Sequence, residues 1–127
     1  MANGEPLMPD ADIPATINRV RKSFEAGRSK PPGWRRGQLQ QLRQMLVKRE
    51  DDFLEALAAD LGKCRTEGWV SEVGFLTAEI RHTLKHLRRW LKAERVRTPL
   101  SSQPGRSRIV REPLGVVLIM GAWNYPR

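Results

Sequence analysis

The chain has 127 residues, which is enough for one small domain with a hydrophobic core and too few for two. Its composition, 39% hydrophobic and 29% charged, excludes an intrinsically disordered protein and is typical of a folded one. A formal net charge of +9 would suit nucleic acid or an anionic membrane as partner, but basic pairs such as Arg35 and Arg36 are spread along the chain among acidic residues. This distribution favours solvated helix faces, and we expect no nucleic-acid partner.

Residues 1–11 hold two prolines, one glycine and no apolar periodicity, which predicts a flexible leader. The segment lacks the basic and apolar regions of a secretion signal, and no run in the sequence approaches the roughly 20 apolar residues of a membrane span. Cys64 is the single cysteine, so an internal disulfide is impossible and a reducing compartment is favoured. We therefore expect a cytoplasmic protein without a membrane segment.

Three stretches between residues 12 and 95 place apolar side chains at the three-four spacing of a helix that is buried on one face. The apolar positions are Ile13, Ile17, Val20 and Phe24 in the first stretch; Leu39, Leu42, Leu46, Phe53, Leu57 and Leu61 in the second; and Val73, Leu76, Ile80, Leu84, Leu87 and Leu91 in the third. Gly27 and Gly62 follow the first two stretches, where glycine commonly ends a helix. The sequence thus predicts three amphipathic helices, with the basic residues of the third directed outward.

From Val96 onward, helical periodicity gives way to turn residues, which predicts a linker. Residues 108–111 then have the character of a short strand. Residues 116–120 are apolar on both faces, as in a parallel strand that helices cover on both sides. The sequence therefore predicts an α/β fold in which an N-terminal helical segment leads into the first strand of a parallel sheet.

A strand of this kind needs neighbouring strands to satisfy its backbone N–H and C=O groups. Only residues 121–127 follow it in the chain, and they are too few to supply such strands. We therefore expect this chain to be a truncated portion of a longer α/β protein.

Few residues have a spacing or sequence context that is typical of a catalytic or metal-binding site. Cys64 lies between two basic residues, as reactive thiols often do, but no histidine or carboxylate can be assigned beside it as a base. His82 and His86 are four residues apart, a weak zinc pattern because a third ligand and a catalytic glutamate are missing. We therefore expect an incidental cysteine, exposed histidines and no metal site. The chain also lacks a glycine-rich phosphate loop.

Asn124 follows the predicted strand, within a turn that begins at Gly121. Ligands of open α/β sheets bind beyond the carboxyl ends of the strands. An asparagine amide placed there can donate a hydrogen bond to an oxygen that becomes negative during a reaction. Asparagine also stabilises turns, so the residue type alone leaves both roles open.

The run EPLGVVLIMGAWNYP at residues 112–126 resembles the aldehyde dehydrogenase superfamily, in which an E-P-x-G-V segment leads through a strand into a W-N-[YF]-P turn. Residues 34–35, 60–63 and 71–74 are similar to class 3 members in particular. The resemblance extends over residues 13–126, which is nearly the whole chain. It implies a Rossmann-like parallel sheet and an NAD(P)-dependent oxidoreductase.

The resemblance also implies roles for individual residues. Asn124 matches the oxyanion-hole asparagine, whose amide donates to the oxygen of the thiohemiacetal that forms on a catalytic cysteine. Met120, Gly121, Ala122 and Trp123 match positions at the strand end that line the dinucleotide site without holding its pyrophosphate. The complete enzyme would oxidise an aldehyde to a carboxylic acid as a homodimer. The sequence leaves open which aldehyde it uses and whether the cofactor is NAD or NADP.

In family members the catalytic cysteine, the water-activating glutamate and the cofactor-binding segments all lie beyond the W-N-Y-P turn, and Cys64 matches none of them. We therefore expect an N-terminal part of the enzyme that is inactive alone and binds no cofactor tightly. Residues 12–95 would belong to the cofactor-binding domain, and residues 96–127 would form a linker and the first, incomplete strands of its sheet. The alternative is a non-enzymatic helical module that binds a complete subunit or an anionic partner.

Overall fold

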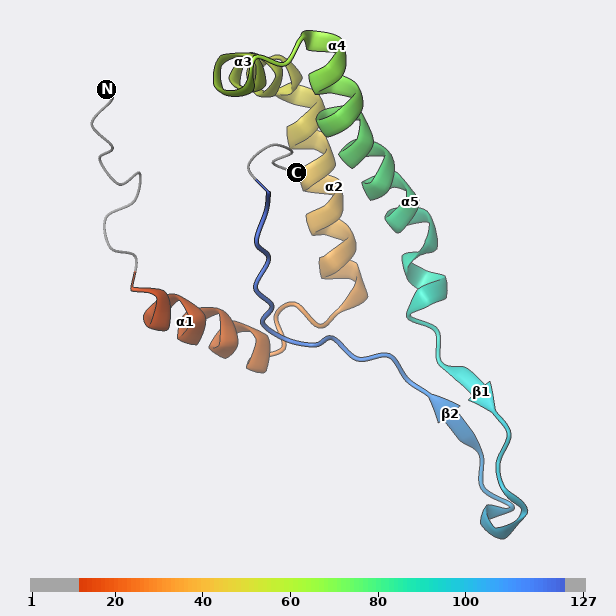
Figure 1. The fold of residues 1–127 in the computed structure, drawn as a ribbon. Coiled ribbons are helices and arrows are strands. Elements are labelled where there is room, and N and C mark those ends of the chain that lie inside the picture. Colours follow the sequence, from red (N-terminus) through yellow and green to blue (C-terminus); the bar gives the residue numbers. More distant parts are fainter. Residues whose placement is uncertain (1–11, 123–127) are drawn as a thin grey trace.

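Helix α1 (Ile13–Glu25) begins where the sequence supplies a cap and a proline. In the computed structural model, which describes residues 12–122, Asp12 Oδ1 accepts a hydrogen bond from the Ala15 backbone N–H at 2.9 Å. Pro14 lies in the first turn, where a helix does not need its missing N–H. Figure 1 shows α1 apart from the other helices, and none of its residues is buried. The helix forms as predicted, but most of its apolar face stays exposed, and only Phe24 is half-buried, against Gly115.

Helices α2 (Pro32–Lys48) and α3 (Glu50–Leu61) correct the prediction of one continuous second helix. The chain bends at Arg49, which has φ −113° and ψ 27°. Three acidic residues form the first turn of α3, and their negative charge stabilises a new helix N-terminus at this point. Arg49 Nε donates to Asp52 Oδ2 at 2.7 Å and so bridges the bend.

Helix α4 (Arg65–Gly68), the π-helical turn η1 (Trp69–Val73) and helix α5 (Gly74–Trp90) follow one another without a gap. Gly62 ends α3 in the left-handed region, with φ 65°, which a glycine adopts without strain. Gly68 allows α4 to approach α3 closely, because a Cβ there would lie 3.2 Å from a leucine side chain. The chain thereby reverses, and α5 returns antiparallel beside α2 (Figure 1).

The hydrophobic core lies where α2, α3 and α5 meet. Its buried members are Leu46, Leu54, Val73 and Ile80, and the half-buried Leu39, Phe53, Leu57, Leu76 and Leu84 pack against them. No side chain within residues 12–122 is completely buried. The core is therefore small for a chain of this length.

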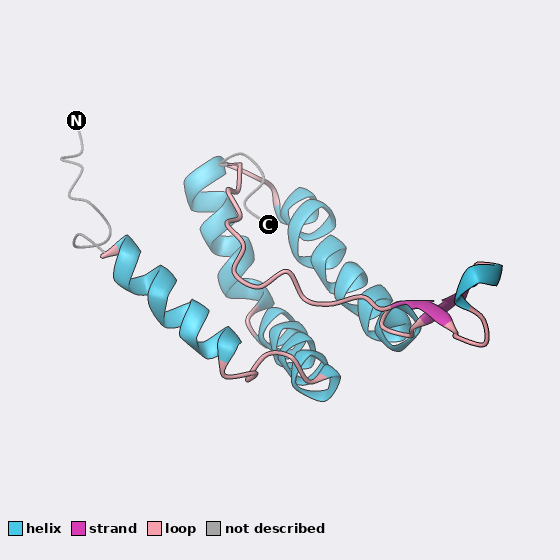
Figure 2. Cartoon of the chain, turned by 90° about the horizontal axis from the view of Figure 1, so that it is seen from below, coloured by secondary structure: helices cyan, strands magenta, loops and turns pink. Residues whose placement is uncertain are grey.

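A two-stranded antiparallel sheet extends from the end of α5 as a hairpin (Figure 2). Strand β1 (Glu94–Val96) pairs with β2 (Ser107–Ile109), so that the Cα of Arg95 lies opposite that of Arg108. The 3-10 turn η2 (Leu100–Ser102) lies between the two strands. Strand β2 overlaps the short strand predicted at residues 108–111, whereas β1 was not predicted and the linker expected from Val96 lies mostly within this hairpin.

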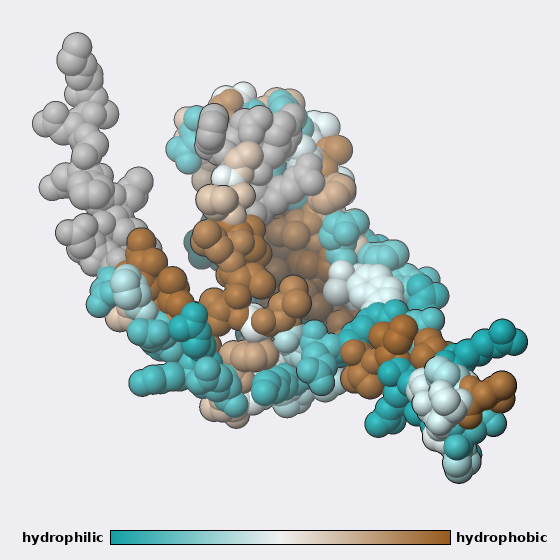
Figure 3. Space-filling model, turned by 60° about the horizontal axis from the view of Figure 1, so that its bottom comes forward, coloured by the Kyte–Doolittle hydropathy of each residue, from teal (hydrophilic) through white to brown (hydrophobic). Residues whose placement is uncertain are grey.

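Residues 116–120, predicted as a parallel strand, have no regular secondary structure here. The described residues are mostly helical with one small antiparallel sheet, and they contain no parallel sheet. Residues 12–122 do not show the predicted parallel sheet, because no neighbouring strand lies alongside to pair with this segment. Leu118, Ile119 and Met120 accordingly expose 84%, 85% and 86% of their surface. Figure 3 shows how much apolar surface this face of the molecule presents.

Candidate functional site

Of the residues predicted to form the site, the structure describes three. Met120, Gly121 and Ala122 lie in the irregular segment that follows β2, and all three are exposed. Trp123 and Asn124 lie outside the described residues. The described residues do not form a site for a dinucleotide, because this segment is exposed and no phosphate-binding loop lies near it.

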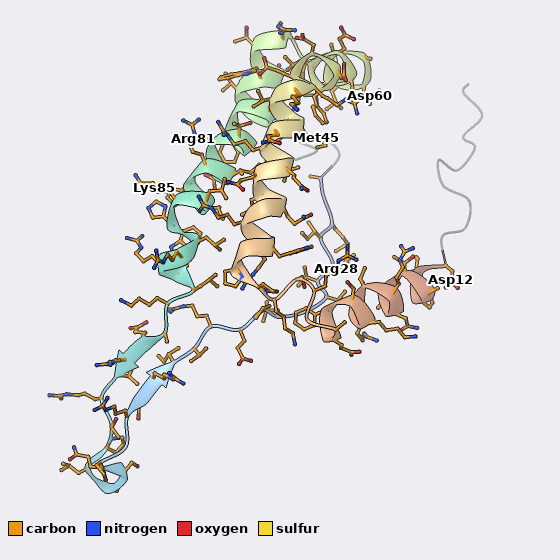
Figure 4. The ribbon with its side chains drawn as sticks, turned by 180° about the vertical axis from the view of Figure 1, so that it is seen from behind. Asp12, Arg28, Met45, Asp60, Arg81 and Lys85 are labelled. Atoms are coloured by element: carbon orange, nitrogen blue, oxygen red, sulfur yellow. The ribbon has the colours of Figure 1, made fainter. Side chains whose placement is uncertain are left out.

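An apolar groove of about 570 Å³ opens between α2, α3 and the start of α5. Its walls are Leu42, Met45, Leu46, Phe53, Ala56, Leu57, Leu61, Val73 and Leu76, and Asp60 and Glu72 are its charged members. Figure 4 shows Met45 and Asp60 coming from two different helices. A groove with this lining accepts apolar side chains in preference to a charged ligand.

A buried ion pair borders the groove. Lys63 Nζ lies 2.7 Å from Glu72 Oε1, and the two side chains expose only 7% and 6% of their surface. The second carboxylate oxygen, Glu72 Oε2, has no hydrogen-bond partner within residues 12–122. Buried carboxylate oxygens normally accept hydrogen bonds, so the ion pair satisfies only one of the two oxygens of Glu72.

Surface polar contacts hold η1, and with it Glu72, against the start of α3. Trp69 Nε1 donates to Glu50 Oε2 at 3.1 Å, and the Arg65 guanidinium donates to Asp51. The hydrogen bond to Asp51, together with its negative charge, raises the pKa of Arg65 above its ordinary value. Because these side chains are exposed, we assign the contacts a positioning role and little stabilisation.

The other residues singled out from the sequence lie at the surface. Cys64 is exposed at the start of α4, and its thiol has no acid or base partner in the part of the chain that the structure describes. His82 is exposed and His86 is half-buried on α5. Residues 12–122 contain no group of three or more histidine, cysteine or carboxylate side chains that would hold a metal. They also contain no helix with the length and apolar character needed to cross a membrane.

Sequence reasoning missed the groove and its ion pair. Lys63 and Glu72 are nine residues apart in the sequence. This separation does not place two side chains next to each other in a helix or a strand, so the sequence did not indicate that they form a pair. One signal was available, since Glu72 directly precedes Val73 at the start of an apolar helical pattern, where a charged residue needs a buried partner.

Comparison with known proteins identifies the family. The family model described as "Aldehyde dehydrogenase family" matches residues 5–127. The chain is 44% identical over 110 residues to aldehyde dehydrogenase family 3 member A2 of Macaca fascicularis, covering 87% of this chain and 23% of that protein. It is 42% identical over 111 residues to aldehyde dehydrogenase family 3 member B1 of Homo sapiens, covering 87% and 24%. It is 36% identical over 119 residues to an aldehyde dehydrogenase of Craterostigma plantagineum, covering 94% and 25%.

A solved structure gives the same result. The substrate-bound state of Staphylococcus aureus AldH superposes with a TM-score of 0.72 at 34% sequence identity, over 81% of this chain and 23% of that one. The chain thus spans about a quarter of the length of the curated relatives that it matches. Both the sequence match and the superposition extend over most of this chain, and the matched relatives include several family 3 proteins. The chain belongs to the aldehyde dehydrogenase family.

Proposed function

We propose that this chain is the N-terminal quarter of a class 3-type aldehyde dehydrogenase that oxidises aldehydes to carboxylic acids with NAD or NADP. The observation that carries the proposal is the family match over residues 5–127, which includes the W-N-Y-P turn. The matched relatives are about four times as long as the part that aligns with this chain. A homodimer and a cytoplasmic location belong to the same proposal, and the single cysteine supports the location.

Asn124 is the residue that contributes to chemistry in this proposal. A thiolate from another part of the enzyme attacks the aldehyde carbon, and the carbonyl oxygen becomes negative as the carbon–sulfur bond forms. The Asn124 amide donates a hydrogen bond to that oxygen and stabilises the charge. Met120, Gly121, Ala122 and Trp123 line the cofactor site at the same strand end, and the rest of the enzyme supplies the nucleophile, the water-activating glutamate and the phosphate contacts.

The fold of the complete enzyme is proposed to cover what this chain leaves exposed. Residues 116–120 then pair as the first long strand of a Rossmann-like parallel sheet, and residues 12–95 lie within the N-terminal cofactor-binding domain. The exposed apolar residues of α1 and the apolar groove support this reading, because each is suited to contact with further protein.

The isolated chain should therefore be incompletely packed. We expect helical circular dichroism together with dye binding, broad NMR lines and aggregation that rises with concentration, because apolar surface and an unpaired segment face water. Deleting residues 116–127 should improve solubility while leaving the helical signal intact, since the α-helices of the described residues all end by Trp90. A dispersed NMR spectrum, a cooperative melt and a monomeric sedimentation profile for the intact chain would contradict this expectation.

One observation favours a second candidate, the helical interaction module that binds an anionic partner. Residues 81–111 contain ten basic residues and a single acidic one, so they account for the entire net charge of +9. Within residues 12–122 one ion pair involves this segment, from Arg111 Nη2 to Glu94 Oε2 at 3.1 Å. Retention of the chain on a polyanion column in 0.15 M salt would support the module if charge reversal of Arg88 and Arg89 removed it while reversal of Arg19 and Arg21 did not.

A further inference from the structure

Three aromatic side chains of α5 form a cluster in which each ring lies close to the other two. His82, His86 and Trp90 follow one another at one-turn spacing. The ring centroids of His82 and His86 lie 4.2 Å apart, and the Trp90 ring lies 5.7 Å from each of them. Sequence spacing places the two histidines on one face, and the structure adds that their rings lie in contact.

The hydrogen bonding of His86 sets which of its nitrogens can bind a metal. Its Nδ1 lies 2.8 Å from the backbone carbonyl oxygen of His82. A carbonyl oxygen only accepts hydrogen bonds, so Nδ1 carries the proton and the lone pair of neutral His86 is on Nε2. This arrangement, in which one nitrogen donates to a carbonyl and the other is free, is the one that metal-binding histidines in proteins normally show.

The pair is partly open to solvent, since His82 is exposed and His86 is half-buried. Arg81 directly precedes His82, and Lys85 directly precedes His86. Both side chains point away from α2 in Figure 4. A metal ion can therefore reach the two rings directly, with water filling its remaining positions.

We propose that His82 and His86 together bind one divalent transition-metal ion, each through one imidazole nitrogen. Imidazole suits Cu²⁺, Ni²⁺ and Zn²⁺, and the stability order of these ions places Cu²⁺ highest. No carboxylate or thiol within residues 12–122 joins the pair, so Mg²⁺ and Ca²⁺, which need oxygen ligands, are not held. The proposal departs from the expectation of no metal site, which considered the sequence spacing of the two histidines without the contact between their rings.

The positive side chains around the pair weaken the site without abolishing it. Arg81, Lys85 and Arg89 lie on the same helix as the pair, and they repel a cation. All three are exposed, so water and salt screen the repulsion, whereas the metal–nitrogen bonds are short and unscreened. Removing one of these charges should therefore leave binding intact or tighten it.

The test is a titration of the full 127-residue chain with Cu²⁺ in a Cys64→Ser background, which removes the single exposed thiol as a competing ligand. We expect one ion per chain and electron paramagnetic resonance hyperfine structure from two nitrogen ligands. Tryptophan fluorescence should be quenched, because the Trp90 ring lies 5.7 Å from both histidine rings. Trp90→Phe should remove the quenched component without changing the affinity.

Variants of each ligand decide the outcome. Loss of a residue that only hydrogen-bonds to a metal ligand typically costs about 10–100-fold in metal affinity. His82→Ala and His86→Ala each remove a ligand itself, so each should weaken Cu²⁺ binding by at least about tenfold. Lys85→Ala is the matched control, because it removes a neighbouring side chain of α5 and keeps both ligands; it should bind at least as tightly as the parent chain. Circular dichroism checks that each variant keeps its helices. Unchanged affinity in both histidine variants, or hyperfine structure from fewer than two nitrogens, would overturn the proposal.

Discussion

Replacing Asn124 with alanine in the complete enzyme that contains this chain should lower kcat by about 10²–10³-fold, the usual scale for the loss of one oxyanion-hole donor. Alanine has no N–H to place against the oxygen that becomes negative when the thiolate attacks. Cofactor affinity should change little, because the amide acts on the aldehyde oxygen and makes no phosphate contact. Steady-state and single-turnover kinetics with a saturating aldehyde measure the effect.

Asn124→Asp is the matched control for this prediction. Aspartate keeps the shape of the side chain but presents acceptor oxygens where the amide donated, so kcat should fall at least as far as in the alanine variant. If kcat stayed within about threefold of the parent enzyme in both variants, Asn124 would have no oxyanion role and would be a turn residue.

Breaking the buried ion pair should have the largest effect on the stability of the helices. Lys63→Met leaves the Glu72 carboxylate buried without its partner, and removal of one member of a buried pair costs about 3–5 kcal/mol. A chain with a small core has a low free energy of unfolding, so a loss of this size is a large part of it. We therefore expect the variant to lose most of its helical ellipticity at 222 nm at lower urea concentration than the parent chain.

The double variant Lys63→Met, Glu72→Leu provides the control. It replaces both charges with apolar side chains that match the lining of the groove, and such replacements are often neutral or stabilising. Its helices should melt at a urea concentration close to that of the parent chain. If the single and double variants unfolded together, the loss would reflect the missing lysine stem and not an uncompensated charge.

The sequence predicted those helices whose pattern is local. The spacing of Ile13, Ile17, Val20 and Phe24 predicts α1 well, and Asp12 supplies its cap. The bend at Arg49 escaped detection because Leu46 and Phe53 are seven residues apart, about two helical turns, so the apolar stripe continues through the bend.

Elements that depend on distant partners were predicted only in part. The strand predicted at residues 108–111 overlaps β2, but its partner β1 has three residues, too few to show an alternating pattern, and the two strands exist because they pair with one another. Residues 116–120 have the composition of a buried strand, but a strand needs neighbours and residues 12–122 offer none. The role of Asn124 came from the motif around it, since an asparagine after a strand fits a turn as well as an oxyanion hole.

The rate of cofactor reduction by the purified 127-residue chain tests most directly whether it is a part of an enzyme and not an enzyme in itself. With NAD or NADP and a panel of aliphatic and aromatic aldehydes, we expect no rise in reduced cofactor above the protein-free rate. The reason is that Cys64, the single thiol, is exposed and has no base beside it in the described residues. Turnover that Cys64→Ala abolished would contradict this, because it would show that the chain contains its own nucleophile.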